Sequence, residues 1–236
     1  MTRRRWIADR VEGHHAFLIG ANAHHLFRVL RAQPGQQFDI AAEGVVRLGT
    51  IMHATANEIQ FHLGEEVAGE VLPEVAVYLS IFKFDRLEWA IEKLTELGVA
   101  RIVPVLAERS AQHLAKAAEA RVERWRKIAR EAAQQARRIS PPEIAAPLKV
   151  PAVTKAAEEC RIILSEAEEA VSLKSSLAGA RPPIALAFGP EGGWTEEELA
   201  SFTSAGWKSA SLGNTILRAE TAAIAAVAVV FSELQK

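Results

Sequence analysis

A repeated alternation of short apolar runs and helical stretches, which begins just after Pro73, constrains the fold of this chain most strongly. Residues 75–82 form an apolar run suited to a buried parallel strand, and residues 85–97 carry apolar side chains at helical spacing. Residues 99–106 then form a second apolar run. A strand, a helix and a strand at this spacing predict a βαβ crossover, which is right-handed in nearly all known sheets.

The helix expected over 85–97 carries signals at both ends. Asp85 and Glu88 stand at the spacing of a variant capping box, in which two side chains satisfy the first free backbone amides. Gly98 follows the last apolar position and allows the left-handed conformation that commonly ends a helix. These signals predict a helix with defined limits.

The same alternation continues along the rest of the sequence. A long helix is expected over 114–138, which stops before two prolines, and an Ala/Val-rich helix over 219–234. Short apolar runs predict further strands at 161–164, 184–188 and 208–212. The second part of the chain is therefore predicted to be an α/β sheet covered by helices on both faces.

The first part of the chain has a different pattern, in which glycine and asparagine separate short β-segments. Such segments are expected at 37–41, 45–53 and 58–63. One helical stretch, 23–31, stops where Pro34 and a glycine follow. We therefore expect a small β-barrel-like domain. Residues 64–73, charged and ending in proline, mark the boundary, so the predicted domains are 1–72 and 73–236.

Composition excludes several classes of protein. With 49% hydrophobic and 24% charged residues, the chain fits a globular protein rather than a disordered or collagen-like one. The apolar run 222–231 is shorter than the roughly 18–20 residues that span a bilayer, and the basic start leads into no hydrophobic signal region. We therefore expect a cytoplasmic protein without a membrane partner. The single cysteine, Cys160, excludes an internal disulfide and a multi-cysteine zinc site.

The net charge of −1 conceals two basic blocks. Residues 1–31 hold six arginines against two carboxylates, and residues 121–138 hold seven basic residues against two. Residues 139–236 are acidic, with eight basic residues against twelve carboxylates. Basic blocks on an acidic background are expected where a polyanion docks, although solvated helix surface gives the same pattern.

A glycine-rich loop follows the predicted strand 184–188, at the place where open α/β sheets bind ligands. It reads Gly189-Pro-Glu-Gly-Gly-Trp194 and leads into Thr195-Glu-Glu-Glu198, which predicts a capping box. The loop lacks the Gly-Lys-Ser/Thr ending of a Walker phosphate site, and three carboxylates in the helix's first turn would repel phosphate. A cationic or zwitterionic ligand suits this loop better; the alternative is an ordinary glycine-rich turn.

A second loop, residues 212–222, connects the last predicted strand to the last helix. Ile216 and Leu217 stand in what should be exposed loop, so they need to be covered either by the core or by a flat apolar ligand. Arg218 and Glu220 flank the start of the helix, where a charged pair either serves catalysis or caps the helix.

Together, the two loops resemble the signature loops of the SPOUT class of RNA methyltransferases, specifically those of the RsmE family, which methylates N3 of a uridine in small-subunit ribosomal RNA. Similar stretches cover nearly the whole chain and include 24–31, 83–89, 93–99, 102–104, 108–110, 124–133 and 138–144. The chain departs from the family at Thr215, where a basic residue is common, and at residues 135–138, which read Gln-Ala-Arg-Arg instead of Gln-Ser-Gly-Arg.

The resemblance implies a PUA-like β-barrel for RNA followed by an α/β domain that is tied in a deep trefoil knot. It also implies a homodimer and S-adenosylmethionine as the cofactor. The residues that would wrap this cofactor lie in the two loops and at the end of a further strand. They are Leu164, Gly189, Pro190, Glu191, Gly192, Gly193, Leu212, Gly213, Asn214, Ile216 and Leu217.

Methylation of uridine N3 requires that this atom lose its proton. Arg218 is expected to stabilise the resulting negative charge or to grip an adjacent phosphate. Glu191 or Glu220 would accept the proton, unless these carboxylates are bonded to backbone amides at helix starts. No metal is required, because the methyl group of a sulfonium is already activated and catalysis is chiefly positioning.

Ribosomal RNA, alone or in the small ribosomal subunit, is the expected partner. Arginines of the two basic blocks would contact its phosphates, which makes binding sensitive to salt. These arginines are Arg3, Arg4, Arg28, Arg31, Arg137 and Arg138. The early histidine pairs 14/15 and 24/25 lack cysteine partners, so a metal site is not expected. Trp89 and Trp125 are expected in the core or an interface.

Two alternatives remain open. The first is a non-catalytic RNA-binding or ribosome-assembly factor that keeps the fold without turnover. Intact glycine loops favour the enzyme, because a degenerate relative is expected to lose them. The second is methylation of another nucleotide, in transfer RNA or elsewhere in ribosomal RNA.

Overall fold

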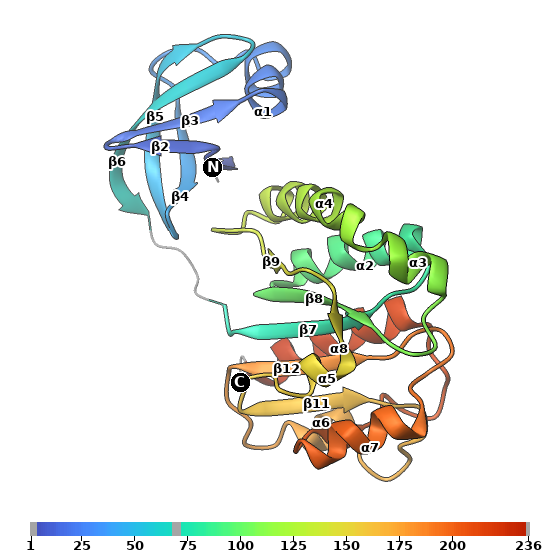
Figure 1. Ribbon diagram of the computed structural model, residues 1–236. Helices are drawn as coiled ribbons and strands as arrows, with labels where there is room; N and C mark the ends of the chain where they lie inside the picture. The colour runs from blue at the N-terminus through green and yellow to red at the C-terminus, as the bar shows by residue number, and fades with distance from the viewer. Residues whose placement is uncertain (1–3, 68–71, 235–236) are drawn as a thin grey trace. The chain divides into compact units, whose positions relative to one another are not determined.

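The computed structural model describes residues 4–67 and 72–234, and these form two compact units (Figure 1). The first unit contains residues up to Val71 together with Ala133–Pro141, and the second contains Leu72–Ala132 and the residues from Pro142 onward. No sequence pattern indicated that a segment near residue 135 belongs with the first unit. Part of the predicted boundary, residues 68–71, lies outside the described residues. The domain limits 1–72 and 73–236 stay a prediction.

In the described part of the first unit, a six-stranded sheet has the order β1-β4-β5-β6-β3-β2. The strands are β1 (Arg5–Ile7), β2 (Arg10–Glu12), β3 (His15–Ile19), β4 (Gln37–Ala42), β5 (Val45–Ala54) and β6 (Glu58–Val67). The three β-segments predicted from the sequence are β4, β5 and β6. Strands β1 to β3 are short, and the sequence pattern did not indicate them.

The first unit has a hydrophobic core of its own. Leu18, Ile40, Ile51 and Phe61 are fully buried in one cluster. The expected helix over 23–31 is split into α1 (Ala21–His24) and a π-helical turn, His25–Val29. The helical stretch ends before Pro34 and Gly35, as predicted.

The segment Ala133–Pro141 is tied to the first unit by packing and hydrogen bonding. Ala133 is fully buried with Ile7 and Val46. The Arg5 guanidinium donates a hydrogen bond of 2.6 Å to the carbonyl oxygen of Arg137 and lies 4.0 Å from Asp39 Oδ2. These contacts explain why the segment belongs with the first unit.

The second unit is built on a parallel sheet with the order β10-β8-β7-β12-β11-β13, to which β9 adds beside β8. Every strand pair in the described part of this sheet is parallel. The strands are β7 (Val75–Ser80), β8 (Arg101–Leu106), β9 (Glu143–Ile144), β10 (Leu148–Lys149), β11 (Cys160–Leu164), β12 (Ile184–Phe188) and β13 (Lys208–Ala210). The predicted α/β sheet is confirmed.

Helices cover both faces of the sheet, as predicted (Figure 1). On one face α2 packs against α8, around buried Leu94, Val227 and Phe231. On the other face α7 contributes Phe202, which packs with Trp207 and Ile163. The α-helices are α2 (Phe84–Leu97), α3 (Gln112–Ala117), α4 (Val122–Gln135), α5 (Val150–Val153), α6 (Leu173–Ser176), α7 (Glu196–Ser204) and α8 (Ala219–Leu234).

Helix α2 ends as predicted but begins differently. Gly98 adopts φ of 108°, and a Cβ there would lie 2.6 Å from Leu72 Cδ1, so glycine suits both the backbone and the space. The predicted capping box of Asp85 and Glu88 is wrong. The helix starts with Lys83 as N-cap and without a side-chain cap, and Glu88 is instead engaged by Arg124 at 2.7 Å.

The prediction of one long helix over 114–138 is also wrong. The chain forms α3, a 3₁₀ turn at Glu119–Arg121 and then α4. Ala118 is fully buried, and its carbonyl accepts a hydrogen bond of 3.0 Å from the amide of Arg121, the tighter i→i+3 pattern that interrupts the α-helix. Trp125, which follows this break, is fully buried, as expected for a core residue. Among the described residues, no helix combines the length and apolarity needed to cross a bilayer.

Candidate active site at the carboxyl edge of the parallel sheet

Four neighbouring strands of the second unit end level with one another. Leu164, the last residue of β11, pairs with Phe188 at the end of β12 and with Ala210 at the end of β13. Phe188 in turn pairs with Leu79 of β7. The loops that follow these parallel strands therefore leave the sheet at one edge, where open α/β sheets bind ligands. Both sequence-predicted loops lie at this edge.

The glycine-rich loop is a tight turn with little space around its backbone. The amide of Gly193 donates a hydrogen bond of 2.8 Å to the carbonyl of Pro190. Gly193 has φ of 70°, and a Cβ there would lie 3.2 Å from Glu166 Oε1. Glycine at this position therefore allows both the left-handed backbone and the close approach of a carboxylate from the loop after β11.

Two side chains fix the far end of this loop. Trp194 is 7% exposed, and its Nε1 donates a hydrogen bond of 3.2 Å to the carbonyl of Leu164. Arg109, just after β8, donates from Nη1 to the carbonyl of Gly192 at 2.9 Å. The predicted capping box is confirmed: Thr195 Oγ1 accepts from the Glu198 amide, and Glu198 Oε2 accepts from the Thr195 amide. Trp194, Arg109 and the capping box at Thr195 thus hold the loop in place.

The second loop exposes apolar surface at the same edge. Gly213 has φ of 119°, and Asn214 is exposed. Ile216 is 83% exposed, whereas Leu212 and Leu217 are half-buried. The core therefore does not cover Ile216. The other cover expected from the sequence, a flat apolar ligand, stays a prediction.

A shared arginine connects the two loops. Arg86, in the first turn of α2, donates from Nη1 to Glu191 Oε1 at 3.0 Å. Its Nε lies 3.8 Å from Oε1 of Glu220 in α8. The sequence stretch 83–89 was noted for its similarity to the family, but the pattern did not single out Arg86 as a site residue. Neither Glu191 nor Glu220 was predicted to share a partner.

Arg218 lies immediately before α8. Its side chain is exposed, and its carbonyl accepts the hydrogen bond of 2.8 Å from the Ala222 amide that begins the helix. The guanidinium is therefore in contact with solvent at the end of the second loop. Besides Arg86, sequence reasoning missed Arg109 at the carboxyl edge of the sheet. Arg109 lies in the stretch 108–110, which is similar to the family.

The predicted RNA-binding arginines differ in exposure. Arg4, Arg28, Arg31 and Arg137 are exposed on the first unit. Arg138 is half-buried, and burial lowers the pKa of its guanidinium to about 10, so it is still charged at neutral pH. Arg3 lies outside the described residues.

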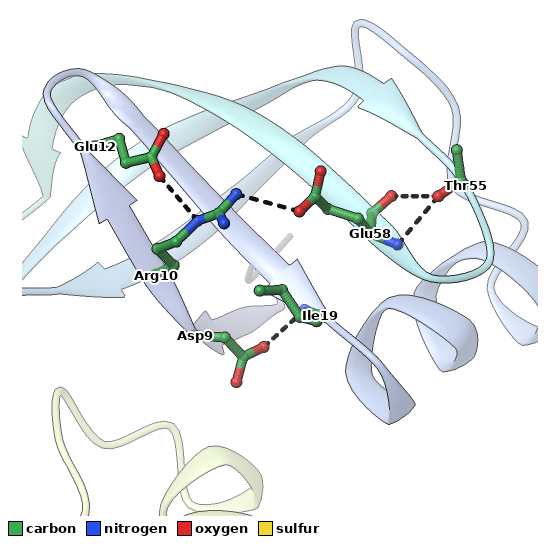
Figure 2. A network of polar contacts seen from close by, with 6 residues as sticks. All are labelled: Asp9, Arg10, Glu12, Ile19, Thr55 and Glu58. Carbon is green, nitrogen blue, oxygen red and sulfur yellow. Dashed lines mark hydrogen bonds and ion pairs between the residues drawn. The ribbon is translucent and has the colours of Figure 1, made fainter.

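One arginine of the first basic block, Arg10, has carboxylate partners in its own unit. Arg10 contacts Glu12 at 3.1 Å and Glu58 at 3.2 Å, and its guanidinium carbon lies 4.2 Å from the centre of the Phe17 ring. Figure 2 shows this network, in which Asp9 also accepts a hydrogen bond from the amide of Ile19. Arg10 thus has a structural role, which the charge count alone did not separate from RNA binding.

Two further sequence observations have structural outcomes. Trp89 is 47% exposed on α2, so it is not a core residue. Within residues 4–67 and 72–234, no group of three or more His, Cys, Asp or Glu side chains is arranged to hold a metal ion.

Two protein-family models match the chain, and together they define a class of RNA-modifying enzyme. A model described as an RNA methyltransferase domain matches residues 70–231, and one described as an RNA methyltransferase PUA domain matches residues 18–63.

The relatives narrow this class. The chain is 36% identical over 222 residues to "Ribosomal RNA small subunit methyltransferase E" of Synechocystis sp., which covers 89% of this chain and 71% of the relative. It is 30% identical over 208 residues to the protein of the same name in Aquifex aeolicus, covering 87% and 90% of the two chains. The chain belongs to the family of ribosomal RNA small subunit methyltransferase E.

Solved structures share the whole fold. A protein of Legionella pneumophila in complex with the cofactor S-adenosylmethionine matches with a TM-score of 0.84 and 25% identity, covering 99% of this chain and 98% of that one. The ribosomal RNA small subunit methyltransferase E of Neisseria gonorrhoeae, at 24% identity, matches with a TM-score of 0.82 over 99% and 98% of the two chains. This second likeness concerns the fold.

Proposed function

We propose that the protein transfers a methyl group from S-adenosylmethionine to N3 of a uridine in 16S ribosomal RNA. The observation that carries the proposal is the joining of the glycine loop and the second loop, through Arg86, at the carboxyl edge of a sheet that belongs to this family. The names of the relatives and the cofactor in the Legionella structure support the same reaction.

The residues at the edge fit this cofactor. Gly193 lets the loop turn tightly beside the Glu166 carboxylate, and Ile216 offers apolar surface for a flat base. Carboxylates of Glu166 and Glu191 lie at the glycine loop, and they favour a cationic ligand. The holding residues are those predicted from the sequence, Leu164, Gly189, Pro190, Glu191, Gly192, Gly193, Leu212, Gly213, Asn214, Ile216 and Leu217.

When bound, the cofactor supplies a methyl group on a positively charged sulfur. The chain's own residues then have two tasks at the uracil ring. Arg218, exposed beside the second loop, stabilises the negative charge that develops on the carbonyl oxygens next to N3. A carboxylate, Glu191 or Glu220, accepts the proton from N3. Positioning of the ring for in-line attack supplies the rest of the acceleration.

RNA binding is assigned to arginines of the first unit and of the segment that joins it. Their guanidinium groups bind phosphates, so affinity falls as salt rises. The arginines are Arg3, Arg4, Arg28, Arg31, Arg137 and Arg138. Ribosomal RNA or the small ribosomal subunit is the partner. The homodimer, the trefoil knot and a cytoplasmic location are further parts of the proposal, which rest on the family resemblance.

The test is mass analysis of nucleosides from the ribosomal RNA of a strain in which the gene is deleted. Loss of 3-methyluridine, and its return when purified protein and S-adenosylmethionine are added, is the expected result. An unchanged level of 3-methyluridine contradicts the proposal. A change in another modified nucleoside then indicates a different target, and no change at all indicates a non-catalytic binding factor.

A further inference from the structure

The first unit contains a pocket of about 320 Å³. Its lining comes from the end of β1, the turn that joins β4 to β5, and the residues Ile139 and Ser140. All of these residues belong to the first unit. The volume falls within the range of small-ligand pockets, about 300–1,000 Å³.

One part of the lining is apolar. Ile7 of β1 and Ala41 and Ala42 of β4 are buried, and Ile139 is half-buried. Apolar contact of this kind suits the flat face of a nucleobase. Proteins that read single-stranded RNA hold unstacked bases against side chains and bind them through their edges.

The polar part of the lining is rich in hydrogen-bond acceptors. Asp9 and Glu43 each bring a carboxylate, which only accepts hydrogen bonds when it is ionised. Arg10, a cation of the described lining, is held by Glu12 and Glu58 (Figure 2). The pocket therefore favours a ligand that offers hydrogen-bond donors.

Glu43 has a backbone conformation that glutamate rarely adopts. Glu43 and Gly44 have φ of 52° and 82°, and they form the two-residue turn between Ala42 and Val45, which pair across the hairpin. A turn with positive φ at both positions strongly prefers Asn-Gly, Asp-Gly or Gly-Gly. Glu43 is exposed, and its carboxylate has no hydrogen bond or ion pair within the described residues. The turn does not account for a glutamate, and an outlier of this kind points to a function.

We propose that this pocket binds one unstacked guanine of the RNA, with the Glu43 carboxylate as the acceptor for its Watson–Crick edge. Guanine presents two adjacent donors there, N1–H and the 2-amino group, and a carboxylate has two oxygens to accept them. Adenine, cytosine and uracil each place an acceptor next to the donor, which repels a carboxylate. Arg137, which is exposed and stands two residues before Ile139, supplies positive charge for the adjoining phosphate. The inference rests on the proposed function, because it takes RNA as the polymer, and it adds a base-specific site.

The experiment measures binding of the full-length protein to short single-stranded RNA by fluorescence anisotropy. The probe is an oligouridylate whose central base is uracil, adenine, cytosine, guanine or hypoxanthine, which is guanine without the 2-amino group. The variants are Glu43→Gln, which keeps the length of the side chain, and Glu43→Asn, which supplies the residue that the turn prefers. Glu65→Gln is the matched control, because Glu65 is an exposed carboxylate of β6 outside the pocket.

The wild-type protein should bind the guanine probe at least about tenfold more tightly than the adenine, cytosine and uracil probes, since a bidentate base contact gives about that discrimination. The affinity for the hypoxanthine probe should lie between these. Glu43→Gln should reduce the preference for guanine below about threefold without weakening the binding of oligouridylate, and Glu65→Gln should keep it. Glu43→Asn should also lose the preference, while its melting temperature rises by about 2 °C or more as the turn relaxes.

A cross-linking measurement locates the bound base. With 6-thioguanine at the central position of the probe, ultraviolet light should attach the RNA to the pocket lining. Peptide mass analysis should then place the adduct within residues 41–44 or 139–140.

Four results overturn the inference. They are equal affinity for all five probes, a guanine preference that survives Glu43→Gln, a cross-link confined to peptides outside the pocket, and a Glu43→Asn variant that melts below the wild type. The last result would mean that the glutamate serves the fold. An unchanged level of 3-methyluridine in the deletion strain, with the guanine preference intact, refutes the proposed function and leaves the pocket assignment in place.

Discussion

Arg109 spans the turn of the glycine loop, with Nη1 2.9 Å from the carbonyl oxygen of Gly192 and 3.3 Å from that of Trp194. Its aliphatic stem also packs on the loop, since a Cβ at Gly192 would lie 3.4 Å from Arg109 Cβ. The end of β8 is thereby joined to the loop after β12, although another strand lies between them in the sheet.

Replacement of Arg109 by alanine should weaken cofactor binding. Hydrogen bonds from a charged donor contribute about 1.5–3 kcal/mol, and about 1.4 kcal/mol corresponds to a tenfold change in affinity. We therefore expect the Kd of S-adenosylmethionine to rise at least about tenfold in calorimetry. Arg101→Ala, at the other end of the same strand, should leave the Kd unchanged. Equal affinities for wild type and Arg109→Ala would show that the loop holds its shape without this clamp.

Gly193→Ala should impair the same loop through its backbone. Alanine at φ of 70° costs about 1–2 kcal/mol, and its Cβ would press on Glu166 Oε1. Gly35→Ala is the matched control, because Gly35 has φ of 87° and a Cβ there would meet nothing within 4 Å. Both variants should melt a few degrees lower, but only Gly193→Ala should weaken cofactor binding. A similar loss of affinity in both variants would contradict this assignment.

Arg28 and Arg10 should differ in their effect on RNA binding. Arg28 is exposed, whereas Arg10 is held by Glu12 and Glu58 (Figure 2). Each phosphate contact to single-stranded RNA contributes about 0.7 to the slope of log affinity against log salt concentration. Arg28→Ala should reduce that slope by about 0.7 in a salt titration of RNA binding, and Arg10→Ala should not. A reduced slope for Arg10→Ala with an unchanged slope for Arg28→Ala would instead place the RNA contact at Arg10, in β2.

Tyr78 offers a titration that reports on the second unit, because it is the single tyrosine of the chain. Burial, and then the neighbouring Glu158 carboxylate, raise the pKa of its phenol to about 12. Absorbance at 295 nm should therefore show ionisation near pH 12 in the folded protein and near pH 10 after unfolding. Since the folded state holds the proton more tightly, stability should fall as pH rises from about 10 to 12.

Replacing Glu158 by glutamine is the control for this titration. It removes the charge that lies 3.2 Å from the Tyr78 hydroxyl while it keeps a hydrogen-bonding side chain. The midpoint should move down but stay above pH 10, because burial remains. A midpoint already near pH 10 in the wild-type protein would mean that the phenol is solvated.

The elements that could be predicted best from the sequence are those whose pattern is strong and local. Strand β12 and helix α8 have the predicted limits, because each is a continuous apolar stretch with clear ends. The two loops at the edge were located for the same reason, since they follow such strands. Strands β1 and β2 have three residues each, too few for a period to be recognised.

Contacts between distant segments set the limit of sequence reasoning. The start of α2 at Lys83 was not predicted, because Glu88 has the spacing of a capping residue after Asp85. In the structure Glu88 instead accepts a hydrogen bond from Arg124 on another helix. The Arg86 bridge could not be inferred, since each of its three residues stands in a separate segment with an ordinary local role. Residue pattern alone located the loops of the site but not the side chain that joins them.

The return of Ala133–Pro141 to the first unit has a practical meaning for anyone who dissects this protein. The backbone passes from one unit to the other three times, near residues 71, 132 and 141. A single cut near residue 71 therefore cannot yield two intact halves, because the amino-terminal fragment lacks the stretch that buries Ala133 and receives the Arg5 hydrogen bond. Separate expression of either half requires an engineered connection, such as a circular permutation.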